Sequence, residues 1–345
     1  YTMGNSRNGG CPFSLGIMTK KRLINLLFKA TVILLPAFVL YREIGSRDDL
    51  PEIVSVFWHQ LHHANPWYLW AAFILVPLNW LAEVQKWRPF VQRHEALSMG
   101  KALGAVLAGY SFALFTPNRI GEYGGRILFV SPRHQWKAFA ANVVGSIGQY
   151  LVLLTGGITG GIWFAGQKMG WSGAQQTKVL CASLPALLAA CFCYFNIGLI
   201  IPVIARLPVL KKADGLISKL RLLQDFTRRD LAYVWYWSAL RYAIYSSQYF
   251  LLLQFFDIKT GVLMGFSGIA TIFLLQTVVP LPAIAGLLVR GSLAIFIWTY
   301  FSANEVGILA ATFVLWIINL ILPALIGTFS LSHVNITTTL GYEDE

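Results

Sequence analysis

Long apolar runs separated by short polar stretches dominate the chain. A helix that crosses the hydrocarbon core of a bilayer needs about 20 mostly apolar residues. Runs that reach or approach this length predict seven membrane-spanning helices, at roughly 23–41, 67–85, 138–165, 179–204, 231–256, 286–303 and 306–328. The pattern therefore predicts an all-α integral membrane protein.

Two further apolar stretches stop before they reach that length. Residues 102–116 run into a proline after Thr116, and residues 262–280 run into a Pro-Leu-Pro sequence. A proline inside a helix removes a backbone hydrogen bond and kinks or ends the helix. Each break is followed by a glycine and a second short apolar stretch, so we expect two re-entrant hairpins besides the seven crossings. The residues expected to shape their turns are Pro117, Gly121, Pro280, Pro282 and Gly286.

The two broken stretches resemble each other, which indicates an internal repeat. Arg126 lies nine positions after Pro117, and Arg290 lies ten positions after Pro280. Three predicted crossings separate the breaks, and an odd number of crossings places them on opposite faces of the membrane. Paired broken segments in such an inverted-topology repeat are typical of a binding site near the midplane.

Composition supports the membrane class and excludes a soluble one. Apolar residues make up 56% of the chain and charged residues only 12%, with a mean hydropathy of +0.60. A soluble domain averages about 25% charged residues. Such a chain has too few charges to cover a surface in water.

The net charge of +12 reflects orientation in the membrane. Nineteen of the 27 Lys and Arg residues lie in segments 7–22, 86–137 and 206–229. Short basic loops of this kind face the cytoplasm, so we expect a cytoplasmic N-terminus and an external loop at 42–65. The confinement of the charge to short loops argues against nucleic acid as a partner.

The sequence divides into three parts. Residues 1–19 are rich in Gly, Asn and Ser and are expected to be a disordered extension. Residues 20–330 form one polytopic membrane domain, and 331–345 a tail. Segment 206–229 places apolar residues at helical spacing between basic ones, which fits an amphipathic surface helix or a plain connecting helix.

Charged residues beside the breaks are the candidate site. Arg119, Glu122 and Arg126 follow the first break, and Arg290 follows the second. Charges at membrane depth are costly and usually functional, and the N-termini of half-helices attract anions. We expect the three arginines to hold an anion, for which a phosphate head group is the natural candidate. Alternatively, Glu122 only neutralises Arg126 at i,i+4, and Arg290 snorkels to the interface.

Other polar residues within apolar runs leave two interpretations open. Arg241 either snorkels to the surface or lines a cavity beside Tyr245 and Gln248. Gln149 and Gln276 either contact the substrate or hydrogen-bond neighbouring helices. Glu83 and Lys86 are expected to form a local ion pair at the interface.

Two motifs carry a resemblance to a known family. The stretch SFALFTPNRIGEYGGRILFV resembles the first signature of the lysylphosphatidylglycerol synthase transmembrane region, a flippase-like family, in Pro117, Gly121, Glu122 and Arg126. The stretch TVVPLPAIAGLLVRGSLAIF is similar to the second signature in its prolines, glycine and arginine. It departs from that signature at three positions, which are Ala283, Ile284 and Gly291.

The resemblance implies a lipid translocator in a bacterial plasma membrane, acting on a phospholipid or a polyprenyl-phosphate-type lipid. Name-giving members of the family carry an additional aminoacyltransferase domain. We expect this domain to be absent, because the chain ends about 15 residues after its last predicted helix. No nucleophile–base pair, phosphate loop or metal-ligand cluster is evident, so we expect neither an enzyme nor a cofactor.

Two other functions fit the sequence. A transporter of a small soluble anion would need a wet cavity closed to lipid, whereas a lipid carrier needs a lateral opening. A membrane-bound lipid transferase would use Glu122 as general base.

Overall fold

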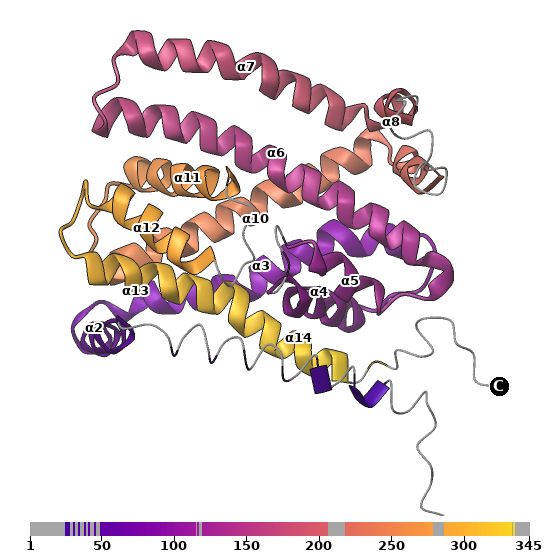
Figure 1. The fold of residues 1–345 in the computed structure, drawn as a ribbon, viewed down its shortest axis with the longest axis horizontal. Helices are drawn as coiled ribbons and strands as arrows, with labels where there is room; N and C mark the ends of the chain where they lie inside the picture. The colour runs from indigo at the N-terminus through magenta and orange to yellow at the C-terminus, as the bar shows by residue number, and fades with distance from the viewer. Residues whose placement is uncertain are drawn as a thin grey trace, which may run out of the picture.

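The computed structural model describes residues 49–114, 116, 119–205, 218–278, 286–332 and 334, with scattered positions between 25 and 45. All regular elements in these ranges are helices (Figure 1). Within them, four helical stretches are long and apolar enough to cross a membrane: Pro66–Gln92, Pro132–Lys168, Gly173–Phe195 and Glu305–Ser332. The predicted all-α membrane class is confirmed.

Five long helical stretches run side by side and form the body of the molecule (Figure 1). Helix α10 begins at a capping box in which the Thr227 side chain accepts a hydrogen bond from the Asp230 backbone N–H. Its 28 residues extend about 42 Å, enough to cross a bilayer despite its charged side chains. The five are α3 (Pro66–Gln92), α6 (Gln135–Lys168), α7 (Gly173–Phe195), α10 (Arg228–Phe255), and α13 (Glu305–Trp316), which continues through a π-helical turn η3 (Ile317–Ile321) into α14 (Leu322–Ser332).

Two pairs of short helices occupy opposite ends of this body. The pair α4 (Met99–Ala113) and α5 (Gly121–Ile127) lies towards one end, and the pair α11 (Val262–Val278) and α12 (Gly286–Trp298) towards the other (Figure 1). Three long helices, α6, α7 and α10, separate the pairs along the chain. Residues 115, 117, 118 and 279–285, which include Pro117, Pro280 and Pro282, lie outside the described residues.

Several predicted boundaries change in the structure. A full crossing at 286–303 is wrong, because the 13 residues of α12 extend only about 20 Å, short of the roughly 30 Å hydrocarbon core. The predicted crossing 179–204 is interrupted at Asn196, where α7 ends and α8 (Ile197–Ala205) begins. The expected loop 42–65 contains α2 (Leu50–His63), which Figure 1 shows end-on, so that its axis is roughly perpendicular to those of the long helices.

Other predictions fall wholly or partly outside the described part of the chain. They concern the extension 1–19, most of the crossing 23–41, the first half of segment 206–229 and nearly all of the tail 331–345. The described half of 206–229 contains a short 3-10 helix, η2 (Arg221–Asp225). A second short helix, η1 (Pro132–His134), precedes α6.

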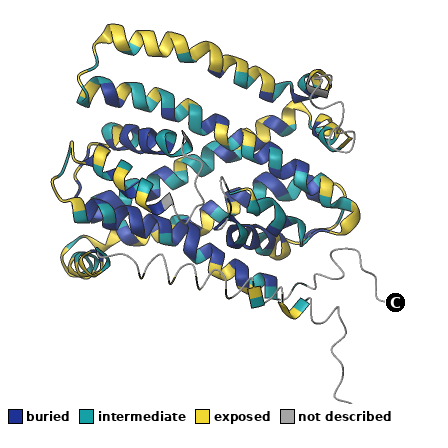
Figure 2. Ribbon diagram, in the orientation of Figure 1, coloured by how far each residue is buried: buried dark blue, intermediate teal, exposed yellow. Residues whose placement is uncertain are grey.

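The outer surface of α7 is apolar. Figure 2 shows α7 exposed along most of its length, whereas the central helices are largely buried. Its exposed side chains include Leu180, Leu184, Leu188 and Phe192. An exposed apolar stripe of this length is stable against lipid and costly in water, which agrees with membrane embedding.

Close helix packing fixes the position of the first short pair. A Cβ atom on Gly121 would lie 2.4 Å from the carbonyl oxygen of Phe112, and one on Gly125 would lie 2.6 Å from that of Ala108. On the other side of α4, a Cβ on Gly327 of α14 would lie 1.9 Å from the Leu107 oxygen. Small residues let helix backbones approach this closely in membranes. Gly121 is therefore required by the α4–α5 approach as well as by its place after the turn.

Two adjacent glycines of α5 test this packing. Gly125→Ala is expected to destabilise the protein by about 1–3 kcal/mol, because its methyl group enters the backbone of α4. Gly124→Ala is the matched control, because a Cβ there meets nothing within 4 Å. The control should be neutral or stabilising by up to about 1 kcal/mol. Thermal unfolding in detergent measures both, and equal midpoints would contradict the packing argument.

Candidate functional site

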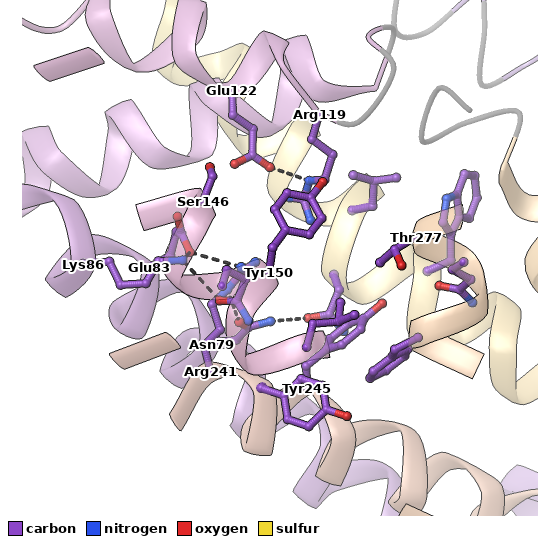
Figure 3. A pocket seen from close by; sticks show the side chains of 18 of the residues that line it. Asn79, Glu83, Lys86, Arg119, Glu122, Ser146, Tyr150, Arg241, Tyr245 and Thr277 are labelled. Carbon is purple, nitrogen blue, oxygen red and sulfur yellow. Dashed lines mark hydrogen bonds and ion pairs between the residues drawn. The ribbon is translucent and has the colours of Figure 1, made fainter. Parts of the chain in front are cut away.

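A polar cavity of about 270 Å³ lies at the centre of the helix bundle. Side chains from α3, α5, α6, α10, α11, α12 and η3 line it. Figure 3 shows Glu83, Lys86, Asn79 and Arg241 together on one side of this space and Thr277 on the other. The cavity therefore lies where both short helix pairs meet the long helices.

Glu83 of α3 is the hub of the buried charges. Its side chain is 6% exposed and contacts three cations. Oε1 lies 2.8 Å from Nη2 of Arg126, and Oε2 lies 2.8 Å from Nζ of Lys86 and 3.1 Å from Nη1 of Arg241. Buried charges persist only when paired. The predicted Glu83–Lys86 pair is present, but it lies deep in the bundle and not at the interface.

Arg126 connects this hub to α5 and α6. Its Nη2 donates to Oε1 of Glu83 and, at 3.0 Å, to Oε2 of Glu122, and its Nη1 donates to Oδ1 of Asn142 at 3.0 Å. The side chain is buried and does not line the cavity. The placement favours the i,i+4 pairing with Glu122 over direct contact with an anion in the cavity. Arg126 acts here as a link between two carboxylates.

Arg241 of α10 points into the bundle, so snorkelling to the surface is wrong. Its Nε donates to Oδ1 of Asn79 at 2.9 Å, and its Nη2 donates to the Tyr110 hydroxyl at 2.9 Å. Asn79 in turn donates to Oδ1 of Asn319 at 2.6 Å. No role was predicted from the sequence for the two asparagines or for Tyr110. The amide side chains of the asparagines within apolar runs could have indicated one for them.

The two residues expected beside Arg241 separate in the structure. Tyr245 lines the cavity, whereas Gln248 is buried elsewhere and donates to the Ala72 carbonyl at 3.1 Å. They lie three positions apart on α10, and this spacing alone did not indicate which of them would face the cavity. The packing of α10 against α3 determines that Tyr245 faces the cavity and Gln248 does not.

The two glutamines both line the cavity. Gln149 accepts a hydrogen bond from Lys86 Nζ at 3.2 Å and donates to the Ser238 carbonyl at 3.4 Å, so it also joins helices. Gln276 makes no side-chain hydrogen bond within the described ranges.

Arg119 and Arg290 come to the cavity from the two short pairs. Arg119, at the end of the turn before α5, pairs with Glu122 and lies over the Tyr110 ring at 4.8 Å. Its φ of 60° is left-handed, which costs a non-glycine residue about 1–2 kcal/mol. Its side chain is nevertheless 37% accessible, which indicates a cavity wide enough for water.

Arg290 lies in the first turns of α12, within electrostatic reach of Arg119 and Tyr245. Among the residues that the structure describes, it forms no ion pair and no side-chain hydrogen bond. The turns 115–118 and 279–285 contain no charged residue that could pair with it. Arg290 is thus a cation at a buried cavity without a protein counter-ion in this region.

The charges at the site do not balance. Lys86, Arg119, Arg126 and Arg241 share the two carboxylates Glu83 and Glu122, and Arg290 adds a fifth cation that contacts neither. Part of the lining is aromatic, with the rings of Tyr245 and Phe273 stacked at 5.0 Å. The arrangement suits an anion that carries or adjoins an apolar group.

These features define a class of protein: a multi-pass helical membrane protein with a central cationic cavity between two pairs of half-length helices. A model of the family described as lysylphosphatidylglycerol synthase TM region matches residues 53–327. The chain belongs to this family, which confirms the resemblance drawn from the two motifs. A comparison with curated protein sequences finds no match.

The hub carboxylate should dominate the stability of the site. Glu83→Gln is expected to destabilise the protein by about 3–5 kcal/mol, because three buried cations lose their shared partner. Asp257→Asn is the control, because Asp257 pairs with Lys259 in an exposed loop, where ion pairs contribute little. Thermal unfolding compares the two, and a Glu83→Gln midpoint as high as that of the control would overturn the role of Glu83.

Proposed function

We propose that the protein binds the phosphate group of an anionic lipid, or of a lipid-linked intermediate, in the central cavity and passes it between the leaflets of a bacterial plasma membrane. The main evidence for this proposal is the excess of positive charge at the cavity. The most important of these charges is Arg290, which has no carboxylate partner in the described region. A half-buried cation at an internal cavity is costly unless an anion joins it.

In this mechanism the position of each residue determines its role. Arg119 and Arg290 contact the phosphate, one from each short pair. Gln149 and Gln276 contact the rest of the head group. Glu122 holds Arg119 through their ion pair. The two short pairs act as re-entrant hairpins entering from opposite faces, so that relative movement of the halves opens the site to each leaflet in turn.

The charge at the two ends supports a cytoplasmic N-terminus. One end carries exposed basic residues of the α3–α4 and α5–α6 connections and of the start of α10, including Arg93, Lys101, Arg133, Arg228 and Arg229. At the other end, segments 166–178, 256–261 and 299–304 carry only the basic residues Lys168, Lys178 and Lys259, and Lys259 pairs with Asp257 at 3.0 Å. The basic end is assigned to the cytoplasm by the positive-inside rule.

Access from the side favours a lipid over a soluble anion. Tyr150 of α6 lines the cavity and is 44% exposed. One turn away, Ile147 is an exposed apolar residue on the same helix. The cavity wall therefore continues onto the apolar outer surface, where the chains of a lipid could remain while its head group enters. A soluble anion would not need a cavity wall that continues onto an apolar outer surface.

A transferase based on Glu122 is less well supported. Its two carboxylate oxygens are engaged separately, Oε1 with Arg119 and Oε2 with Arg126. A general base must face the proton that it removes, whereas both oxygens of Glu122 face guanidinium groups. We therefore propose a binding and positioning role for Glu122, not a catalytic one.

Replacement of Arg290 tests the proposal directly. Arg290→Gln is expected to weaken retention of anionic lipid about tenfold or more, because a charge-assisted contact is lost. Its unfolding midpoint should stay unchanged or rise, because no ion pair of the described protein is removed. Native mass spectrometry of purified protein measures the bound lipid.

The matched control is Arg133→Gln, which removes an exposed arginine before α6. It should retain lipid as the unaltered protein does. Equal retention by all three proteins, or no retained lipid in any of them, would contradict lipid binding at this cavity.

A further inference from the structure

The charge balance of the cavity restricts the kind of phosphate that it can hold. Glu83 is shared by Lys86, Arg126 and Arg241, and Glu122 by Arg119 and Arg126. Arg290 adds a further cation with no carboxylate among the described side chains. The five cations and two carboxylates leave a surplus of three positive charges around one small cavity.

From this surplus we infer that the cavity selects a lipid whose head group is a phosphate monoester or a diphosphate, over one whose head group is a phosphodiester. This inference rests on the function proposed above and specifies its substrate class. A phosphodiester carries a single negative charge and leaves most of the surplus uncompensated. A phosphate monoester carries about 1.5–2 negative charges at neutral pH, and a diphosphate ester carries more.

Hydrogen-bond donors support the same class. Nη2 of Arg119 is buried and has no acceptor in the described protein, and the guanidinium of Arg290 has none there either. Guanidinium groups bind phosphate oxygens in pairs through parallel N–H donors. A terminal phosphate offers three unesterified oxygens to two such groups, whereas a diester offers only two. The third unesterified oxygen and the additional negative charge of a terminal phosphate both face the two arginines.

The lipid part of the ligand has a separate place in the site. Phe273 and Tyr245 form a stacked aromatic pair in the cavity lining, and Val289 lies beside Arg290 on α12. A free phosphate or diphosphate ion would use the arginines and leave this part of the lining unfilled. We therefore assign the anionic group to a lipid.

Two lipids with identical acyl chains test the inference. Phosphatidic acid presents a phosphate monoester, and phosphatidylglycerol presents a phosphodiester. In native mass spectrometry titrations of the full chain, phosphatidic acid is expected to bind about tenfold more tightly. Arg290→Gln should bring the ratio of the two affinities close to one, whereas Arg133→Gln should preserve it.

The outcomes separate this inference from the function on which it rests. Equal affinity for the two lipids, with both weakened in Arg290→Gln, would overturn the selection for a monoester and leave lipid binding standing. No effect of Arg290→Gln on either lipid would overturn the proposed function itself. Inorganic phosphate and pyrophosphate are the soluble probes. If either displaces phosphatidic acid at equal concentration, the ligand is the free anion, and the assignment to a lipid fails.

Discussion

The buried carboxylate of Glu83 is the interaction on which the centre of the protein depends. It lies on α3 and neutralises Arg126 from α5 and Arg241 from α10, besides Lys86 on its own helix. Without it, burying these cations in a low-dielectric interior would be costly. A single acidic residue therefore fixes how three helices meet and keeps basic side chains beside an internal cavity.

Close backbone packing supplies the second constraint. Glycines on α5 and α14 let both helices approach α4 closely, as at Gly125 and Gly327. Inside a membrane, apolar contact with a neighbouring helix is little better than contact with lipid, so close approach and polar contacts must hold the helices together. The first short pair is held firmly by this packing, and its turn delivers Arg119 to the cavity wall in a left-handed conformation.

The two constraints together leave the positive charge of the site only partly compensated. The carboxylates satisfy the deeper cations, whereas Arg119 and Arg290 face the open space from opposite short pairs. A site of this kind is preorganised for an anion, because the cost of burying the cations is already met by folding. The family match over residues 53–327 sets this arrangement in a lipid-related family.

The sequence by itself determined the class of the protein, because apolar runs of bilayer length and basic loops are local properties that no tertiary contact overrides. It also predicted both broken stretches and the family, since prolines, glycines and motif spacing are visible along the chain. Only the tertiary structure decided the half-length of α12, the helix within 42–65 and the inward direction of Arg241. It also separated Arg126, enclosed by Glu83 and Glu122, from Arg290, which remains open to the cavity. Both are arginines at similar distances from a proline. The carboxylate that buries Arg126, Glu83, lies on another helix, α3, so spacing along the chain carries no information about which of the two arginines would be neutralised.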